Sequence, residues 1–214
     1  TGKTSDTFVA DLTATPTWNN FGYFKYDNMD EYAYTSNNFK TGEEETALPS
    51  FVNYVDGIYV GYRFYETAAA EGLINYDDTV VYPFGYGLSY TTFTQEMGAI
   101  SEDNGTISFD VTVTNTGDVA GKDVVEVYYN PPYTNGGIEK ASANLIQFEK
   151  TEVLQPGDSQ TITVSFDAED MASYDTYGAG CYVLEAGDYQ ISINSDSHNV
   201  IDSQTYTVAS TVTY

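Results

Sequence analysis

Basic residues are scarce in this sequence: seven Lys and Arg residues stand against 32 Asp and Glu residues, and the formal net charge is −25. Binding to nucleic acid requires basic groups that replace the counterions of the phosphate backbone, so the composition argues against that class of protein. It argues equally against docking on anionic lipid, which attracts clusters of Lys and Arg. No apolar run approaches the roughly 20 residues of a membrane helix, so we expect no membrane insertion and a soluble chain.

Cysteine, histidine, tryptophan and arginine each occur once, as Cys181, His198, Trp18 and Arg63. A single Cys cannot form a disulfide within the chain, and metal sites built from several Cys and His residues are excluded. An acidic chain offers carboxylates to calcium, but no loop has the ligand spacing of an EF-hand. We therefore predict no metal site and no cofactor.

Tyrosine is abundant, with 21 residues, and aromatic residues make up 15% of the chain. Tyr buries a large apolar ring but needs a partner for its hydroxyl group. This aromatic content argues against disorder, which a very acidic composition would otherwise suggest. Because the first residue is Thr1, we expect a processed chain or a fragment of a longer one. The compartment, bacterial cytoplasm or secretion, stays open.

From about residue 106 the sequence alternates with a period of two. Ile107, Phe109, Val111 and Val113 are separated by polar residues, which is typical of a half-buried strand. Turn residues such as Pro156-Gly157 separate further segments of this kind, which are residues 124–129, 145–153, 162–166, 189–193 and 206–212. About seven short strands within residues 93–210, with one helical turn at 168–174, predict a mainly β fold: a fibronectin type III or immunoglobulin-like antiparallel β-sandwich. The Cys…Trp…Cys spacing of immunoglobulin domains is absent, which favours the fibronectin-like version.

Residues 1–92 are less regular and are predicted to form an irregular N-terminal wrapping segment, followed by the sandwich at residues 93–214. Residues 13–50 are expected to be a long loop, and such loops are usually functional or packed on a neighbour. Gly57–Tyr65 is aromatic and β-branched, so we expect it to be extended. Glu66–Glu71 contains three Ala residues and predicts a short helix that ends at Gly72.

Residues that could carry chemistry are few. His198 could be a general base, but no nucleophile motif accompanies it, and we favour a polar residue in a turn. Cys181 has no basic neighbour that would lower its pKa, so buried packing is the preferred interpretation. Carboxylates are plentiful, but adjacency in the sequence does not supply the separation of about 5 to 9.5 Å that a glycosidase pair needs. We identify no catalytic residue in this chain.

Two aromatic segments stand out. Tyr54–Glu66 contains the sole arginine among four tyrosines, and Tyr82–Phe93 alternates glycine with aromatic residues. Arg stacks on rings and makes bidentate bonds to carboxylates, and glycine allows tight turns between large flat side chains. We interpret the second segment as a loop that leads into the first strand and packs on a partner outside the chain. The predicted inter-domain docking residues are Tyr62, Arg63, Tyr82, Phe84, Gly85, Tyr86, Gly87, Leu88 and Tyr90.

These segments resemble glycoside hydrolase family 3, the β-glucosidase and β-xylosidase family. The core of Tyr82–Phe93, Pro-Phe-Gly-Tyr-Gly-Leu-Ser-Tyr, resembles the stretch that leads into the family's fibronectin type III-like domain. Asp56–Tyr65 is similar to the family's Glu-Gly-Ile-Tyr-Val-Gly-Tyr-Arg-Tyr-Tyr, with Asp56 in place of Glu and Phe64 in place of Tyr. Further matches within that domain are Leu145–Lys150, Leu154–Ser159 and Gly187-Asp188-Tyr189, and Gly2-Lys3-Thr4 resembles the end of the family's α/β sandwich domain.

The resemblance covers essentially the whole chain and implies a non-catalytic part of a β-glucosidase. Residues 1–92 would be the tail of the α/β sandwich domain with a linker, and residues 93–214 the fibronectin type III-like domain. The family's nucleophilic Asp and its acid/base Glu have no counterpart here. The implied partners are the barrel and the α/β sandwich, and the parent enzyme would act on β-glucosides or oligosaccharides by retaining hydrolysis. The alternative is a carbohydrate-binding or adhesion-type β-sandwich module, because this fold serves many functions.

Overall fold

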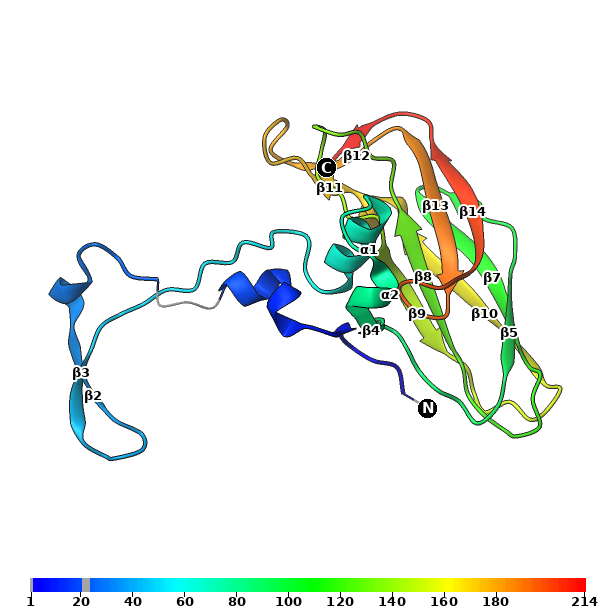
Figure 1. Cartoon of the computed structure of the whole chain (residues 1–214). Helices are drawn as coiled ribbons and strands as arrows, with labels where there is room; N and C mark the ends of the chain where they lie inside the picture. Colours follow the sequence, from blue (N-terminus) through cyan, green and yellow to red (C-terminus); the bar gives the residue numbers. More distant parts are fainter. Residues whose placement is uncertain (1, 21–23) are drawn as a thin grey trace. The chain divides into compact units, whose positions relative to one another are not determined.

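The computed structural model describes residues 2–20 and 24–214 (Figure 1). The chain divides into two compact units: Thr1–Ala10 together with Gly61–Tyr214, and Asp11–Val60. We call residues 61–92 the linker. Within the described residues, no helix has both the length and the apolar character needed to cross a bilayer.

Two antiparallel sheets form the larger unit (Figure 1). The first has the order β10-β7-β5, with β6 also paired to β7, and the second has the order β14-β13-β8-β9. Their strands are β5 (Phe93–Met97), β6 (Ser101–Asp103), β7 (Thr106–Asn115), β8 (Val124–Asn130), β9 (Asn144–Lys150), β10 (Ser159–Asp167), β13 (Gly187–Asn194) and β14 (Val200–Val208). A small third sheet joins β11 (Ser173–Tyr174), β12 (Tyr182–Leu184) and β15 (Val212–Thr213). The predicted β-sandwich is confirmed.

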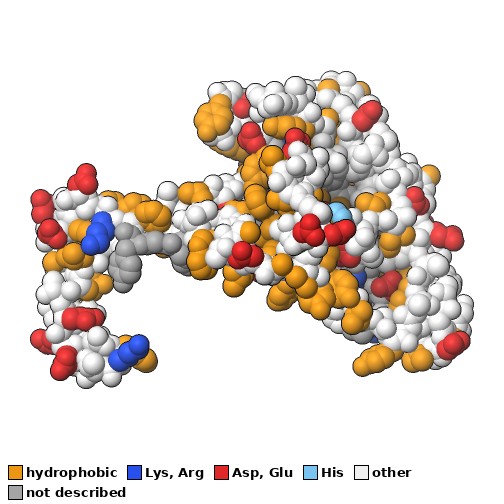
Figure 2. All heavy atoms as spheres, viewed as in Figure 1, with side chains coloured by type: hydrophobic (Ala, Val, Ile, Leu, Met, Phe, Trp, Pro, Cys, Tyr) orange, Lys and Arg blue, Asp and Glu red, His pale blue; other side chains and the backbone are white. Residues whose placement is uncertain are grey.

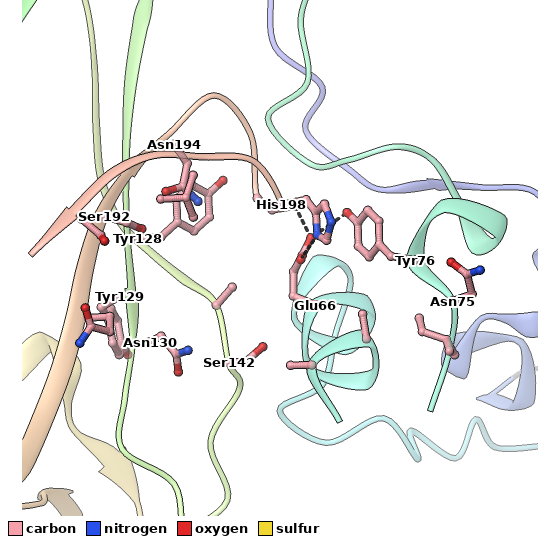
Figure 3. A pocket seen from close by; sticks show the side chains of 18 residues that line it. Glu66, Asn75, Tyr76, Tyr128, Tyr129, Asn130, Ser142, Ser192, Asn194 and His198 are labelled. Atoms are coloured by element: carbon pink, nitrogen blue, oxygen red, sulfur yellow. Dashed lines mark hydrogen bonds and ion pairs between the residues drawn. The ribbon is translucent and has the colours of Figure 1, made fainter. Parts of the chain in front are cut away.

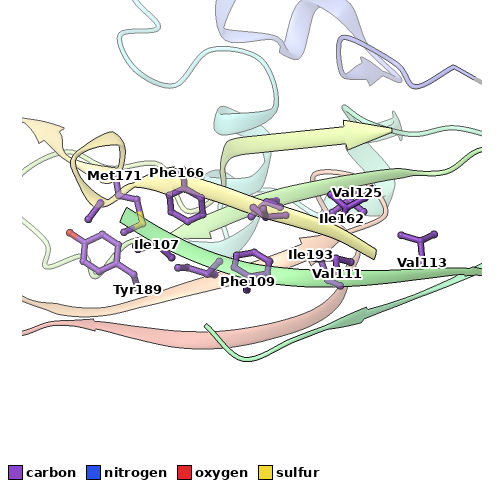
Figure 4. Close-up of a cluster of buried hydrophobic side chains, with 14 of the residues drawn as sticks. Ile107, Phe109, Val111, Val113, Val125, Ile162, Phe166, Met171, Tyr189 and Ile193 are labelled. Atoms are coloured by element: carbon purple, nitrogen blue, oxygen red, sulfur yellow. The ribbon is translucent and has the colours of Figure 1, made fainter. Parts of the chain in front are cut away.

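The core lies between the two large sheets (Figure 4). Apolar residues of β7, including Ile107 and Val111, lie beside Phe166 and Ile162 of β10 on one face of the first sheet. The second sheet contributes alternate residues of β8 and β13 to the same cluster: Val125, Val127, Ile191 and Ile193. The period-two pattern arises because successive side chains of a strand point to opposite faces of its sheet.

Between β10 and β11 the chain makes the single helical turn that the sequence predicted. This is the 3-10 helix η4 (Ala168–Met171), and Asp167 and Asp170 close its N-terminus as a capping box. Such reciprocal bonds satisfy backbone N–H groups that have no partner inside a helix. The strand predicted at residues 206–212 is divided instead, because β14 ends at Val208 and β15 begins at Val212.

The prediction of an extended segment at Gly57–Tyr65 was wrong for its last four residues, which open helix α1 (Tyr62–Ala70). Tyr65 packs with Tyr76 and Val80 in a second buried cluster, formed with helix α2 (Tyr76–Thr79) and strand β4 (Val80–Tyr82). Burial of one helical face therefore outweighs the β-propensity of the aromatic run. Beyond the helix, Gly72 takes a φ of +70°, consistent with the predicted end.

The smaller unit contains regular elements, although its residues 13–50 were predicted to be a long loop. These are the 3-10 helices η1 (Leu12–Ala14), η2 (Pro16–Asn20) and η3 (Met29–Tyr32), and the hairpin of β2 (Tyr34–Asn37) and β3 (Glu44–Ala47). Asn20 is 2% exposed, and its side chain bonds to Asp56 Oδ1 at 2.8 Å and to the backbone N of Val55 at 2.8 Å. One buried amide thus joins the two ends of this unit.

Strand β8 is buried on both faces. Val125 and Val127 face the core, whereas the alternate residues Glu126 and Tyr128 lie on the outer face and are only 4% and 2% exposed. Tyr128 donates its hydroxyl proton to Glu126 Oε2 over 2.9 Å, and Lys3 Nζ lies 3.4 Å from Glu126 Oε1. Burial raises the pKa of Glu126 from 4.5 to about 7, although Lys3 acts in the opposite direction.

Two chain segments that are distant in sequence cover Glu126. Residues 2–5 bond to residues 83–86 through Thr4 N to Tyr86 O, 2.8 Å, and Gly85 N to Thr4 O, 2.9 Å. With β1 (Phe8–Val9) paired to β4, this places the N-terminal residues and the linker side by side. Gly85 has a φ of +81°, and a Cβ atom there would lie 2.1 Å from Glu126 Oε2. Only glycine fits both the backbone conformation and the space.

We expect Glu126→Gln to change how stability depends on pH. The pKa of Glu126 is higher in the folded state than in the unfolded state, so the folded chain holds the proton between these values. The stability that the protonated Glu126 contributes is therefore fully present below pH 4.5. It is lost as the pH rises through about 7. Urea unfolding at pH 5 and pH 8 measures this loss. From pH 5 to pH 8 the free energy of unfolding of the wild type should fall relative to that of the Gln variant, by at most about 3 kcal/mol. Glu152, which is paired to Lys122 and 86% exposed, supplies the control Glu152→Gln. A stability difference between the wild type and Glu126→Gln that is independent of pH would contradict the assignment.

We expect Gly85→Ala to destabilise the chain by about 1–3 kcal/mol. The Glu126 carboxylate cannot move away from the new methyl group without loosening its contacts with Lys3 and Tyr128. Gly105→Ala is a matched control, because Gly105 has a φ of +86° but no atom within 4 Å of the position that a Cβ would take. Thermal melts of both variants separate backbone strain from crowding, and equal losses would show that the contact with Glu126 contributes nothing.

Candidate functional site

The linker meets the outer face of the β8–β13 sheet through an aromatic stack. The rings of Tyr62 and Phe84 are stacked with centroids 4.7 Å apart, and the Tyr62 ring meets the edge of Tyr128 at 6.0 Å. The Tyr62 hydroxyl accepts a hydrogen bond from the backbone N of Leu145 over 2.8 Å. Tyr62 therefore joins helix α1 to both β8 and β9.

A buried carboxylate, Glu66, forms the second part of this joint (Figure 3). Its Oε1 accepts from the hydroxyl of Tyr76 at 2.7 Å and from the hydroxyl of Ser197 at 2.9 Å. Its Oε2 lies 2.8 Å from Nδ1 of His198. Three donors thus surround one carboxylate that is 8% exposed, which is what a buried charge requires.

The imidazole of His198 is held on its face as well as at Nδ1. Its ring lies parallel to that of Tyr76, with centroids 3.6 Å apart and an interplanar angle of 6°. Burial, and then the neighbouring Glu66 carboxylate, raise the pKa of Tyr76 well above its usual range. Tyr76 therefore stays a neutral hydrogen-bond donor, and the cluster ties α1 and α2 to the turn after β13.

The cluster does not have the geometry of a hydrolase triad. Ser197 donates to the Glu66 carboxylate and not to the imidazole, so the nucleophile–base hydrogen bond is absent. His198 lies in the turn Ser195–Asn199, where its backbone N bonds to Asp196 Oδ1 at 3.0 Å. Within residues 2–20 and 24–214, no group of three or more His, Cys, Asp and Glu side chains could hold a metal ion.

Glu66 was missed by the sequence analysis. A single Glu beside an Ala run is typical of a solvent-facing helix residue, and two of its three partners lie 131 and 132 residues further along the chain. The one feature of the sequence that pointed to this cluster was the single histidine, His198, which lies in a segment with no nucleophile motif.

The predicted docking residues fall into two groups. Tyr62, Phe84 and Gly85 contact the chain's own sandwich, so the expectation that Tyr82–Phe93 packs on a partner outside the chain needs correction for Phe84 and Gly85. Gly87 approaches the N-terminal residues, because a Cβ atom there would lie 2.7 Å from the carbonyl oxygen of Gly2. The linker ends up close to the sandwich because Phe84 O also accepts a hydrogen bond from Ser197 N, over 2.8 Å.

Arg63 lies at the edge of the joint. Its guanidinium carbon is 5.8 Å from the centroid of the Tyr62 ring. It lowers the pKa of Tyr129, although burial, the larger effect, raises that pKa to about 12. The Nε atom of Arg63 is buried and has no hydrogen-bond partner in the part of the chain that the structure describes.

The remaining docking residues are mostly exposed. Tyr82 is 46%, Leu88 70% and Tyr90 92% exposed, and Phe8, beside Tyr82 at a centroid distance of 6.3 Å, is 53% exposed. We call these four residues the exposed strip. Tyr86 is half-buried and lies 5.1 Å from the Tyr82 ring. Hydrophobic side chains gather on the face that carries the imidazole (Figure 2).

The chain is similar in sequence and fold to known proteins. Residues 123–197 match the family described as fibronectin type III-like domain. The chain is 35% identical to β-glucosidase A of Butyrivibrio fibrisolvens over 212 residues, which is 91% of this chain and 22% of that protein. It is 40% identical to a β-glucosidase of Ruminococcus albus over 162 residues, 74% of this chain and 16% of that protein.

Solved structures agree. β-Glucosidase 3B of Thermotoga neapolitana, solved in complex with glucose, superposes with a TM-score of 0.77 and 31% identity, covering 100% of this chain and 25% of that one. A GH3 β-glucosidase of Bifidobacterium adolescentis gives a TM-score of 0.64 and 30% identity over 79% of this chain and 23% of that one. The chain thus spans a quarter or less of the length of these relatives. The resemblance seen in the sequence is confirmed: residues 123–197 belong to the fibronectin type III-like domain family, and the chain is related to a segment of the family 3 β-glucosidases.

Proposed function

We propose that this chain is a non-catalytic structural part of a family 3 β-glucosidase and that it braces the catalytic domains of that enzyme. The parent enzyme would remove terminal β-D-glucosyl residues by retaining hydrolysis. The observation that carries the proposal is the two-sided linker. One part of it is bonded to the sandwich through Glu66 and Phe84, while Tyr82, Leu88 and Tyr90, its members of the exposed strip, are open to solvent.

The exposed strip supports a docking role. Contiguous exposed apolar patches mark interaction sites in soluble proteins. In the strip, Phe8 meets Tyr82 ring to ring, and Leu88 and Tyr90 follow Tyr82 along the linker. Interfaces between domains of one chain commonly bury about 600–1,500 Å². We therefore assign Tyr82, Leu88 and Tyr90 to the surface that meets the catalytic domains, with Tyr62, Phe84 and Gly85 as the residues that hold this surface on the sandwich.

The buried carboxylates support the absence of an active site in this chain. A retaining glycosidase needs two carboxyl groups about 5–5.5 Å apart and open to the substrate. Glu66 is surrounded by three donors, and Glu126 lies beneath Gly85 and Lys3. Asp196 is 5% exposed and accepts hydrogen bonds from His198 N and Asn199. Each of these three groups is committed to holding the fold together.

We expect the purified 214-residue chain to be inactive on aryl β-glucosides. A full-length β-glucosidase of the family, assayed at the same protein concentration, is the positive control. Hydrolysis that separates from the chain on a further chromatography step would indicate a contaminating enzyme. Hydrolysis that stays with the chain at constant specific activity through that step would overturn the proposal.

We expect the triple substitution Tyr82→Ser, Leu88→Ser, Tyr90→Ser to separate stability from docking. Leu88 and Tyr90 are exposed in the chain itself, so its free energy of unfolding should change by no more than about 0.5 kcal/mol at each of these sites. Tyr82 also meets the rings of Phe8 and Tyr86, so its loss should cost about 0.5–1.5 kcal/mol. In the full-length enzyme that carries this segment, the same change should lower the melting temperature and kcat/KM, because interface anchors cost more than about 1 kcal/mol each when removed.

Tyr177→Ser is the matched control, since Tyr177 is 96% exposed but lies in the loop between β11 and β12. It should leave both the chain and the enzyme unchanged. A full-length enzyme that tolerates the triple substitution as well as it tolerates Tyr177→Ser would remove the docking role of the exposed strip.

A further inference from the structure

A groove that the proposed function does not use lies beside the Glu66 cluster. It has a volume of about 590 Å³ and runs between helices α1 and α2 on one side and strands β8, β13 and β14 on the other (Figure 3). Pockets of about 300–1,000 Å³ are the size that takes small molecules. The groove lies wholly within the larger compact unit.

The lining of the groove is polar but almost uncharged. It contains four side-chain amides, four serine hydroxyls and three tyrosines, together with Glu66, His198 and small apolar residues; the amides are Asn75, Asn130, Gln190 and Asn194, and the serines are Ser142, Ser192, Ser197 and Ser203. No Lys or Arg residue is among the described residues that line it, so an anionic ligand would find no counter-charge. The Glu66 carboxylate already accepts from three donors and has little capacity left for a cation.

One lining residue has an unused hydrogen-bonding atom. Asn194 is 2% exposed, and its Oδ1 has no hydrogen-bond partner among the described residues. A buried acceptor without a partner costs about as much as its desolvation, so such an atom calls for a donor. Ser192, two residues earlier on the same face of β13, is also buried against this groove.

His198 adds a polar ring nitrogen from the turn after β13. A carboxylate can only accept, so Nδ1 of His198 carries the proton that it shares with Glu66. The second ring nitrogen, Nε2, accepts in a neutral ring and donates in a charged one, and a hydroxyl group complements either form. The side chain of His198 is 38% exposed, so a ligand can reach it.

We propose that this groove binds a neutral sugar of about monosaccharide size. Sugar hydroxyl groups both donate and accept, which matches a wall of amides and serines. A sugar hydroxyl is the donor that Asn194 Oδ1 lacks. This site goes beyond the bracing role and does not rest on it, because binding can be measured on the chain alone.

The test is a titration of the nitrogen-15-labelled 214-residue chain with D-glucose, followed by NMR through the side-chain NH₂ signals of Asn and Gln. We expect saturable shifts of the groove amides with a dissociation constant on the order of 1 mM. D-Glucuronate, the anionic counterpart, should bind more weakly, since the groove has no cation and the chain carries a net charge of −25. The absence of saturable shifts with glucose, or tighter binding of glucuronate, would overturn the proposal.

Asn194→Leu assigns the site. Leu has nearly the same shape and removes the acceptor without a partner, so the melting temperature should hold or rise while glucose binding weakens at least about tenfold. Gln155→Leu, at an exposed amide in the turn before β10, is the matched control and should bind as the wild type does. If the Asn194→Leu variant unfolds, Ser192→Ala is tested in its place, and it too is expected to weaken glucose binding. Full glucose affinity in a folded groove variant would contradict the assignment.

Discussion

The covering of Glu126 is the interaction on which the arrangement of the linker depends. A strand at this position of a sandwich would ordinarily expose its outer face, yet Glu126 and Tyr128 are almost fully buried there. A buried carboxylate is tolerated only with partners, and Lys3 and Tyr128 supply them. Lys3 reaches its place because residues 2–5 bond to residues 83–86, and Gly85 alone can pass so close to the carboxylate. The N-terminal residues, the linker and the sheet are therefore mutually dependent.

The sandwich was predictable because its strands bury one face against the core. In β7 the apolar residues fall on alternate positions, and the structure buries those same side chains. The same alternation says nothing about whether the other face meets water. Glu126 and Tyr128 satisfy the pattern of an exposed face equally well, so the coverage of β8 became visible only from the fold. Likewise, Tyr62–Tyr65 has the composition of a strand, and its helical form follows from packing against α2 and β4.

The joint around Glu66 could not be derived from the sequence for a related reason. Its members come from α1, α2 and the turn after β13, and no spacing along the chain connects them. The prediction that His198 lies in a polar turn was correct as far as the backbone is concerned. The local sequence does not show which way the His198 ring points. In the structure the ring stacks on Tyr76 and bonds to the Glu66 carboxylate. A polar residue in a turn and a residue that closes a long-range contact have the same local signature.

The buried and the exposed side chains of the linker contribute different kinds of interaction. Hydrogen bonds are directional, so those made by Glu66, Lys3 and Phe84 O fix how the linker and the N-terminal residues lie on the sandwich. Apolar burial is not directional and scales with area, so the exposed strip can contribute free energy to docking without setting its angle. A partner that docks on the strip would therefore receive its orientation from the polar joint beneath. For that reason the residues that set the geometry of such a brace are expected on its buried side, where substitution acts through the fold, and those that set its strength on the exposed side.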